Sequence, residues 1–208
     1  MLSPDKIGDL LQPFCSSLSA SQADQLVKYL NLLLRWNKTI NLTSVTNPEE
    51  VVQRHFGESF CLAKAFGSAG KLLDIGSGAG FPGLALKILY PDMAVTLLEP
   101  VTKKRAFLKE AARECGMASV QVLPDRIEVF ASGPGQGAFD TVTARAVGGL
   151  ESLIPAAAKC LRCSGRLALW LGEEQAPQAK QSEPSLDWIE PVPIPLSDRR
   201  VILIGRKA

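Results

Sequence analysis

Residues 71–89 carry the sequence KLLDIGSGAGFPGLALKIL, which joins an apolar run to three alternating glycines and then to an amphipathic stretch. The apolar run predicts a buried strand, and the stretch after Pro82 predicts a helix, because proline suits the first helical position. Gly76, Gly78 and Gly80 allow positive φ angles and a close approach of the backbone to a ligand. The segment therefore predicts a strand-turn-helix unit with a nucleotide-shaped ligand at its turn.

Two ligands compete for this turn. The residues from Gly78 to Gly83 satisfy the dinucleotide pattern GxGxxG, so the glycines alone do not choose. Asp74 favours S-adenosylmethionine, because a carboxylate at the strand tip repels a pyrophosphate and attracts the ammonium and sulfonium groups of the methyl donor. We therefore predict S-adenosylmethionine as cofactor, with Asp74, Gly76 and Gly78 in its site. A nicotinamide dinucleotide and a turn that serves packing alone stay open as alternatives.

Side chains that follow the next strands extend this prediction. Glu99 ends the apolar run 94–98, about 20 residues after the glycine turn, where an acidic side chain accepts both ribose hydroxyls. Ile127 follows the third predicted strand and is expected to lie against the adenine. Arg145 follows the fourth, where a guanidinium binds the carboxylate of the donor or a substrate phosphate. The alternatives are a solvated glutamate at 99 and a surface ion pair at 145.

Composition limits the other classes of function. The 208 residues are 46% hydrophobic with a formal net charge of +2, which suits one α/β domain with an extension and permits a polyanionic partner. The five cysteines are scattered, and the only close pair, Cys160 with Cys163, together with the single histidine supplies too few ligands for zinc, so no metal is predicted. The first eleven residues lack the layout of a signal peptide, and charges interrupt the apolar stretch 153–171, so we expect a cytoplasmic protein without a membrane span.

The pattern of the chain changes near residue 68. Residues 1–67 show helical periodicity and predict a helical N-terminal extension, with Ser21 as the cap of one helix. Residues 68–208 alternate between strand and helix periods, which predicts a Rossmann-like α/β domain with helices on both faces of a mostly parallel sheet. The seven predicted strands lie near 71–75, 94–99, 119–123, 139–144, 166–171, 187–192 and 200–205, the last two forming a late hairpin.

Taken together, these motifs resemble the RsmG family of bacteria, also called glucose-inhibited division protein B, whose members methylate guanine N7 in 16S ribosomal RNA. The resemblance spans nearly the whole chain. It rests on Trp36-Asn37-Lys38, Asn41-Leu42-Thr43, His55 with Glu58-Ser59, Asp74 to Gly83, Lys103-Lys104-Arg105 with Phe107-Leu108, Arg126 with Glu128, and Arg145-Ala146. Glu58 and Glu99 stand where the family usually has aspartate, and both keep the charge.

The resemblance implies a seven-stranded class I methyltransferase whose donor contacts are Gly76, Phe81, Ile127, Glu128 and Arg145. It implies 16S ribosomal RNA, or a small ribosomal subunit particle, as partner, and we expect a monomer. We also expect a group of cations to hold RNA phosphates, and it comprises Lys103, Lys104, Arg105, Arg199 and Arg200.

The implied reaction needs no acid or base. Guanine N7 carries a lone pair and no proton, so it attacks the sulfonium methyl directly, and the enzyme supplies alignment. No proton transfer is assigned to His55, which by itself fits a packed, hydrogen-bonded residue on an amphipathic helix. Two other hypotheses stay open: a methyltransferase for a small molecule or another RNA, and an NAD-binding oxidoreductase or non-catalytic nucleotide sensor.

Overall fold

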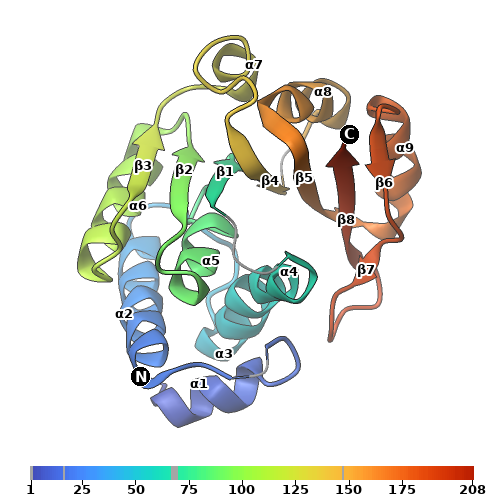
Figure 1. Cartoon of the computed structure of the whole chain (residues 1–208). Coiled ribbons are helices and arrows are strands. Elements are labelled where there is room, and N and C mark those ends of the chain that lie inside the picture. The colour runs from blue at the N-terminus through green and yellow to red at the C-terminus, as the bar shows by residue number, and fades with distance from the viewer. Residues whose placement is uncertain (1, 16, 67–69, 147) are drawn as a thin grey trace.

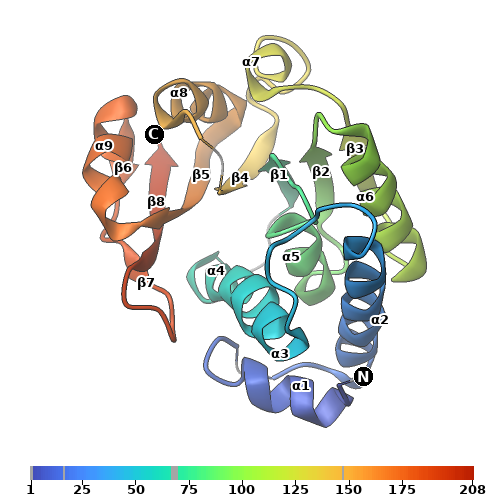
Figure 2. The ribbon, with the colours of Figure 1, turned by 180° about the vertical axis from the view of Figure 1, so that it is seen from behind.

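The computed structural model describes residues 2–15, 17–66, 70–146 and 148–208, which form one sheet with helices on both faces (Figures 1 and 2). The elements before the sheet are α1 (Pro4–Leu11), α2 (Ala20–Asn37), α3 (Pro48–Val51), the π-helix η1 (Val52–Gly57) and α4 (Glu58–Phe66). The helices within and after it are α5 (Gly83–Leu89), α6 (Thr102–Glu114), α7 (Ile127–Phe130), α8 (Leu150–Cys160), the short 3₁₀ helix η2 (Glu173–Gln175) and α9 (Ala176–Ser182).

The sheet contains eight strands among the described residues, in the order β3-β2-β1-β4-β5-β8-β6, with β7 paired on β8. They are β1 (Lys71–Ile75), β2 (Ala94–Leu98), β3 (Val120–Leu123), β4 (Phe139–Arg145), β5 (Leu161–Gly172), β6 (Leu186–Trp188), β7 (Val192–Pro193) and β8 (Arg200–Lys207). The first five run parallel, whereas β8 is antiparallel to β5, β6 and β7. The predicted Rossmann-like architecture and the mostly parallel sheet are confirmed.

The prediction of a single strand near 187–192 is wrong in detail. Two short strands, β6 and β7, occupy this part of the chain, and residues 189–191 between them belong to neither. Pro191 lacks the backbone N–H that a continuous ladder needs, so the strand breaks before it. The late hairpin itself is present, because Val192 pairs with Ile202 across antiparallel β7 and β8.

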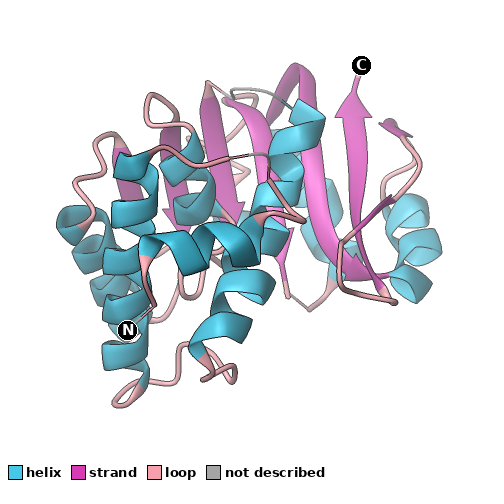
Figure 3. Ribbon diagram, turned by 90° about the horizontal axis from the view of Figure 1, so that it is seen from below, coloured by secondary structure: helices cyan, strands magenta, loops and turns pink. Residues whose placement is uncertain are grey.

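Alternation along the strands separates two apolar layers. Leu72 and Leu97 pack with helices α1 to α6 in one core, whereas Leu73 and Leu98 pack with α7, α8 and α9 in the other. Successive side chains of a strand point to opposite faces, so each buried strand serves both layers. Figure 3 shows the strands as one twisted sheet with helices along it. The fold is a three-layer α/β/α arrangement.

The N-terminal helices share their core with the sheet. Gln22 and Gln25 on α2 donate side-chain hydrogen bonds to the carbonyls of Ile88 (3.1 Å), in the last turn of α5, and of Cys115 (2.8 Å), the C-cap of α6. The predicted cap Ser21 is wrong by two residues, because Ser19 and Gln22 form a reciprocal capping box. The predicted division between residues 67 and 68 lies outside the described residues and stays a prediction.

The C-terminal ends of the parallel strands lie at one edge of the sheet, and the antiparallel strand β8 begins at the same edge. Arg200, the first residue of β8, pairs with Gly172, the last residue of β5. The glycine turn, Glu99 and Arg145 follow or end β1, β2 and β4 at this edge. Ligands of open α/β sheets bind beyond this edge. In the part of the chain described here, no helix is long and apolar enough to cross a membrane.

Candidate functional site

The turn between β1 and α5 takes the conformation that its glycines permit. Gly76, Gly78 and Gly80 have φ angles of 64°, 54° and 88°, a region that other residues adopt at a cost. Gly83, the first residue of α5, lies so close to β1 and β2 that an added Cβ would stand 2.9 Å from Asp74 Cβ and 2.7 Å from Leu97 Cδ2. The glycines therefore bring α5 against the strands and leave the turn open toward a ligand.

Two carboxylates each accept one backbone N–H group at this turn. Asp74 Oδ2 accepts from Gly83 N (3.3 Å), and Asp74 Oδ1 accepts from the Thr143 hydroxyl (2.8 Å). Glu99 Oε2 accepts from Gly78 N (2.9 Å). A dinucleotide pyrophosphate needs such N–H groups at the start of the helix, and here it would meet two negative charges instead. The geometry disfavours a phosphate over the glycines.

Asp74 is fully buried and lines neither of the cavities described below. Burial raises the pKa of its carboxyl to about 6, against the hydrogen bonds from Thr143, Ser77 and Gly83, which act to lower it. Its carboxylate therefore acts on the turn through the hydrogen bond from Gly83 N and through its electrostatic field. The predicted contact of Asp74 with the donor stays a prediction.

A first cavity of about 160 Å³ opens beyond β1 and β2. Its wall is largely apolar, with Leu98 and Ile127, and it carries the ionisable side chains of Arg126 and Glu128. Gly76 contributes its edge. An apolar wall with a few polar groups suits a purine ring. Three residues predicted for the donor site, at positions 76, 127 and 128, thus lie together.

A second cavity of about 350 Å³ begins at the same Gly76 and extends over the glycine turn to η1. Gly78 and Phe81 line it, together with a loop that contains Thr43. Its charged lining residues, among those the structure describes, are all basic: Arg54, Lys104 and Arg145. The buried Arg54 Nε has no partner within the described residues. This cavity therefore suits a ligand with an anionic group.

Phe81 forms an aromatic stack beside the second cavity. Its ring stacks on Tyr29 at 5.5 Å with 7° between the planes, and on His55 at 5.0 Å with 29°. Tyr29 also donates a hydrogen bond to Ala79 O (2.6 Å) in the turn. Helix α2 thus contacts and holds the turn. Sequence reasoning missed Tyr29, because a tyrosine among leucines on an amphipathic helix carries no signal beyond core packing.

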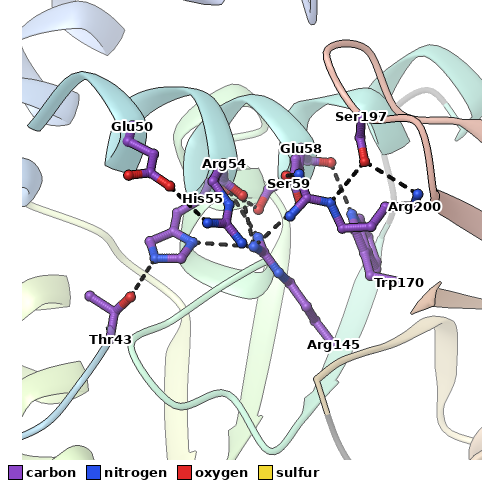
Figure 4. Close-up of polar contacts among 10 residues, drawn as sticks. All are labelled: Thr43, Glu50, Arg54, His55, Glu58, Ser59, Arg145, Trp170, Ser197 and Arg200. Carbon is purple, nitrogen blue, oxygen red and sulfur yellow. Dashed lines mark hydrogen bonds and ion pairs between the residues drawn. The ribbon is translucent and has the colours of Figure 1, made fainter. Parts of the chain in front are cut away.

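Buried Glu58 binds two arginines from two strands, Arg145 at the end of β4 and Arg200 at the start of β8 (Figure 4). Glu58 is 3% exposed, and its oxygens lie 3.3 Å from Arg145 Nη2 and 2.9 Å from Arg200 Nη2. Burial raises the pKa of Glu58, while the two guanidinium groups act to lower it. Arg145 also donates to Arg54 O (2.7 Å). Its guanidinium is therefore held in place by η1 and α4 while it lines the second cavity.

The predicted RNA-binding cations occupy two places along the strand-end edge. Lys103 is exposed and Lys104 lines the second cavity, both in the first turn of α6. Arg105 donates to Glu99 O (3.0 Å). Arg199 is exposed beside β8, whereas Arg200 is engaged by Glu58 and Ser197. The structure thus leaves Lys103 and Arg199 most accessible, and RNA contact stays a prediction for all five.

No group of three or more histidine, cysteine, aspartate or glutamate side chains with metal-binding geometry is present in the described ranges. The prediction that no metal takes part is not tested by this observation. Among the cysteines, Cys163 is exposed, whereas Cys61, Cys115 and Cys160 are buried.

Solved structures place this fold among the Rossmann-like methyltransferases. An S-adenosylmethionine-dependent methyltransferase from Aquifex aeolicus superposes with a TM-score of 0.65 at 12% identity, covering 81% of this chain and 97% of that one. A ribosomal protein L11 methylase from Lactobacillus delbrueckii subsp. bulgaricus gives 0.62 at 19% identity, covering 74% and 79%. At these identities the likeness shows the fold alone.

Sequence comparison identifies the family. The model of the rRNA small subunit methyltransferase G family matches residues 22–194. A ribosomal RNA small subunit methyltransferase G of Roseiflexus castenholzii is 38% identical over 196 residues, covering 90% of this chain and 84% of the relative. A relative of the same name from Syntrophotalea carbinolica is 32% identical over 98% of both chains. The chain belongs to the rRNA small subunit methyltransferase G family.

Proposed function

We propose that this protein transfers a methyl group from S-adenosylmethionine to N7 of a guanine in 16S ribosomal RNA. The observation that carries the proposal is the glycine turn, where two carboxylates accept the N–H groups of Gly78 and Gly83 and where two cavities meet at Gly76. Such a turn suits a nucleoside with a cationic centre and disfavours one with a pyrophosphate. Membership of the family supports ribosomal RNA as the acceptor.

The two cavities fit the two halves of the donor. The first cavity suits the adenine, with Ile127 against the ring and Glu128 near its amine. The second, larger cavity suits the amino-acid half on the side of Arg145, whose cationic wall would meet the carboxylate, and leaves the side of Thr43 to the acceptor base. Glu99 lies at the turn, where its carboxylate can exchange a backbone N–H for the ribose hydroxyls. S-adenosylmethionine supplies the activated methyl as a sulfonium.

Alignment is the contribution of the chain to this reaction. Guanine N7 has no proton to lose, and holding the reacting atoms in line lowers the barrier by roughly 7 to 11 kcal/mol. His55 lies beside the cavity, but burial and the neighbouring Arg145 and Arg54 lower its pKa to about 3. It is thus neutral at physiological pH and is held by hydrogen bonds, which fits a reaction without a general base.

The cations of the strand-end edge are proposed to hold RNA phosphates around the acceptor. A-form RNA hides N7 in a deep, narrow major groove, so the guanine has to come from a loop or a distorted segment. Lys103 and Arg199 lie on the exposed part of this edge, and Lys104 lies at the cavity. A cytoplasmic monomer that acts on 16S ribosomal RNA or on the small-subunit particle is part of the proposal.

Labelled-methyl transfer tests the proposal. Small ribosomal particles from cells that lack this protein are incubated with it and with labelled S-adenosylmethionine, and the 16S RNA is digested to nucleosides. We expect the label in 7-methylguanosine at one position. Donor binding without any label in ribosomal RNA would indicate another acceptor, and a preference for NAD over S-adenosylmethionine would indicate an oxidoreductase or sensor.

A further inference from the structure

The loop before α3 presents Thr43 to the second cavity in a fixed position. Asn37, the last residue of α2, closes this loop with its side chain: Oδ1 accepts from Leu42 N (2.9 Å) and Thr43 N (3.0 Å), and Nδ2 donates to Thr43 O (2.9 Å). Thr43 itself is half-buried and lines the cavity. The motifs at 36–38 and 41–43 thus build a rigid support for one hydroxyl group.

The tautomer of His55 decides whether the Thr43 hydroxyl accepts or donates a hydrogen bond between these two side chains. Arg145 Nη2 lies 3.2 Å from His55 Nδ1, and a guanidinium can only donate, so Nδ1 must be the accepting nitrogen (Figure 4). A neutral imidazole then carries its proton on Nε2, which lies 2.7 Å from Thr43 Oγ1. We assign His55 this tautomer from its neighbours. His55 therefore donates to Thr43.

Thr43 Oγ1 consequently accepts two hydrogen bonds. The second comes from the backbone N–H of Val45 at 3.1 Å. A hydroxyl has two lone pairs and one proton, so both lone pairs are used and the proton is left. No described residue accepts that proton. The hydroxyl at the cavity wall is thus a hydrogen-bond donor and cannot act as an acceptor.

We propose that the Thr43 hydroxyl donates its hydrogen bond to O6 of the acceptor guanine and thereby selects guanine over adenine. This inference rests on the proposed function. O6 lies beside N7 on the same edge of guanine, whereas adenine places an amino donor there. A bond to N7 itself would occupy the lone pair that attacks the methyl group. A hydroxyl without a free lone pair cannot accept from the amino group of adenine.

Arg145 and His55 are positioning residues in this arrangement. Arg145 fixes the tautomer of His55, and buried Glu58 in turn holds Arg145. Neither side chain needs to touch the guanine. The selectivity of Thr43 depends on a chain of contacts that runs from α4 through β4 and η1 to the loop at 43.

The test compares three variants on two acceptor bases. Thr43→Val removes the hydroxyl at nearly constant volume, and Thr43→Ser retains it. Thr39→Val is the matched control, because Thr39 is exposed and its hydroxyl donates to Trp36 O (3.0 Å). Particles carry either guanine or 2-aminopurine at the methylated position, and 2-aminopurine lacks O6. Methyl transfer gives kcat/KM, and calorimetry gives the Kd for S-adenosylmethionine.

We expect Thr43→Val to lower kcat/KM on guanine by about tenfold, the value of one lost hydrogen bond, while donor affinity is unchanged. Thr43→Ser and Thr39→Val should stay near wild type. On 2-aminopurine, wild type and Thr43→Val should be equal, because the partner of the hydroxyl is missing.

Three results would overturn the inference alone, while wild type still forms 7-methylguanosine. These are an unchanged rate of Thr43→Val on guanine, an equal loss on both bases, and a loss of donor affinity, which would assign the hydroxyl to the donor. Absence of 7-methylguanosine with the wild-type protein would reject the proposed function, and this inference with it.

Discussion

Asp74 is a buried carboxylate in the proposed donor site, and its burial affects the stability of the fold. Its carboxylate is fully buried, and three hydrogen-bond donors, from Thr143, Ser77 and Gly83, favour its charged form without offsetting the loss of water. The charged form of Asp74 therefore costs stability. Such a cost is expected where a charge serves binding.

Replacement of Asp74 by asparagine should change how stability depends on pH. The carboxyl has a pKa of about 6 when folded and 3.8 when unfolded, so between these values the folded chain holds a proton that the unfolded chain has lost. The unfolding free energy therefore falls by up to about 3 kcal/mol as pH rises from 4 to 6, and this contribution is flat above 6. Asp74→Asn should lack this fall. Urea unfolding gives the unfolding free energy of both proteins at pH 4.5 and at pH 7.5. The prediction is contradicted if wild type and Asp74→Asn differ in this free energy by the same amount at both pH values.

At the scale of elements, Glu58 joins three segments. The run from α3 through η1 to α4 is continuous, and the π-helix shifts the register of its side chains at Arg54 and His55. π-Helical segments are frequent at functional sites. Glu58 at the start of α4 then binds β4 through Arg145 and β8 through Arg200. This contact holds the N-terminal helices against the strand-end edge.

Glu58→Gln should destabilise the protein by about 3 kcal/mol, because it leaves two guanidinium groups facing each other without a buried partner charge. The matched control is Glu50→Gln, since Glu50 pairs with Arg54 at 2.7 Å but its side chain is 45% exposed. The control should cost about 0.5 kcal/mol or less. Chemical denaturation compares the two. Equal costs would show that the buried ion pairs contribute no more than a surface pair.

The glycines of two helices should respond in opposite directions. In α5, Gly83→Ala adds a methyl group that meets Leu97 and Asp74. It should lower the free energy of unfolding by about 1–3 kcal/mol. In α1, Gly8→Ala adds a methyl group that meets no atom within 4 Å. It should stabilise the protein by about 0.5–1 kcal/mol, because alanine favours helices. Thermal or urea unfolding reports both signs. A stabilised Gly83→Ala protein would refute the close packing of α5 on β1 and β2.

At the scale of the whole molecule, the sequence predicts what is local and leaves out what the fold brings together. The unit at 71–89 was predictable because strand, turn and helix are contiguous, and parallel strands place Glu99 and Arg145 at the same edge. The contact of Thr43, His55 and Arg145 joins segments from both halves of the chain, and no periodicity indicates it. The break between β6 and β7 was missed although Pro191 is a local signal for it.

The strand-end edge should carry the salt dependence of RNA binding. Each phosphate contact adds about 0.7 to 0.9 to the slope of log affinity against log salt, so Lys103→Gln with Lys104→Gln should reduce the slope by about 1.4 to 1.8. Lys159→Gln is the control, because Lys159 is exposed at the end of α8, where β5 begins at the opposite edge. Titration of 16S RNA at several salt concentrations measures the slope. An unchanged slope in the double variant would reject this surface.

The central claim is that the turn at Gly76 holds a cationic methyl-donor nucleoside and excludes a pyrophosphate. A crystal of the protein equilibrated with equal concentrations of S-adenosylhomocysteine and NAD tests it most directly. We predict the thioether alone, with its adenine against Ile127 and its carboxylate toward Arg145. A nicotinamide coenzyme with its pyrophosphate across Gly76, Gly78 and Gly80, and no thioether, would contradict the claim.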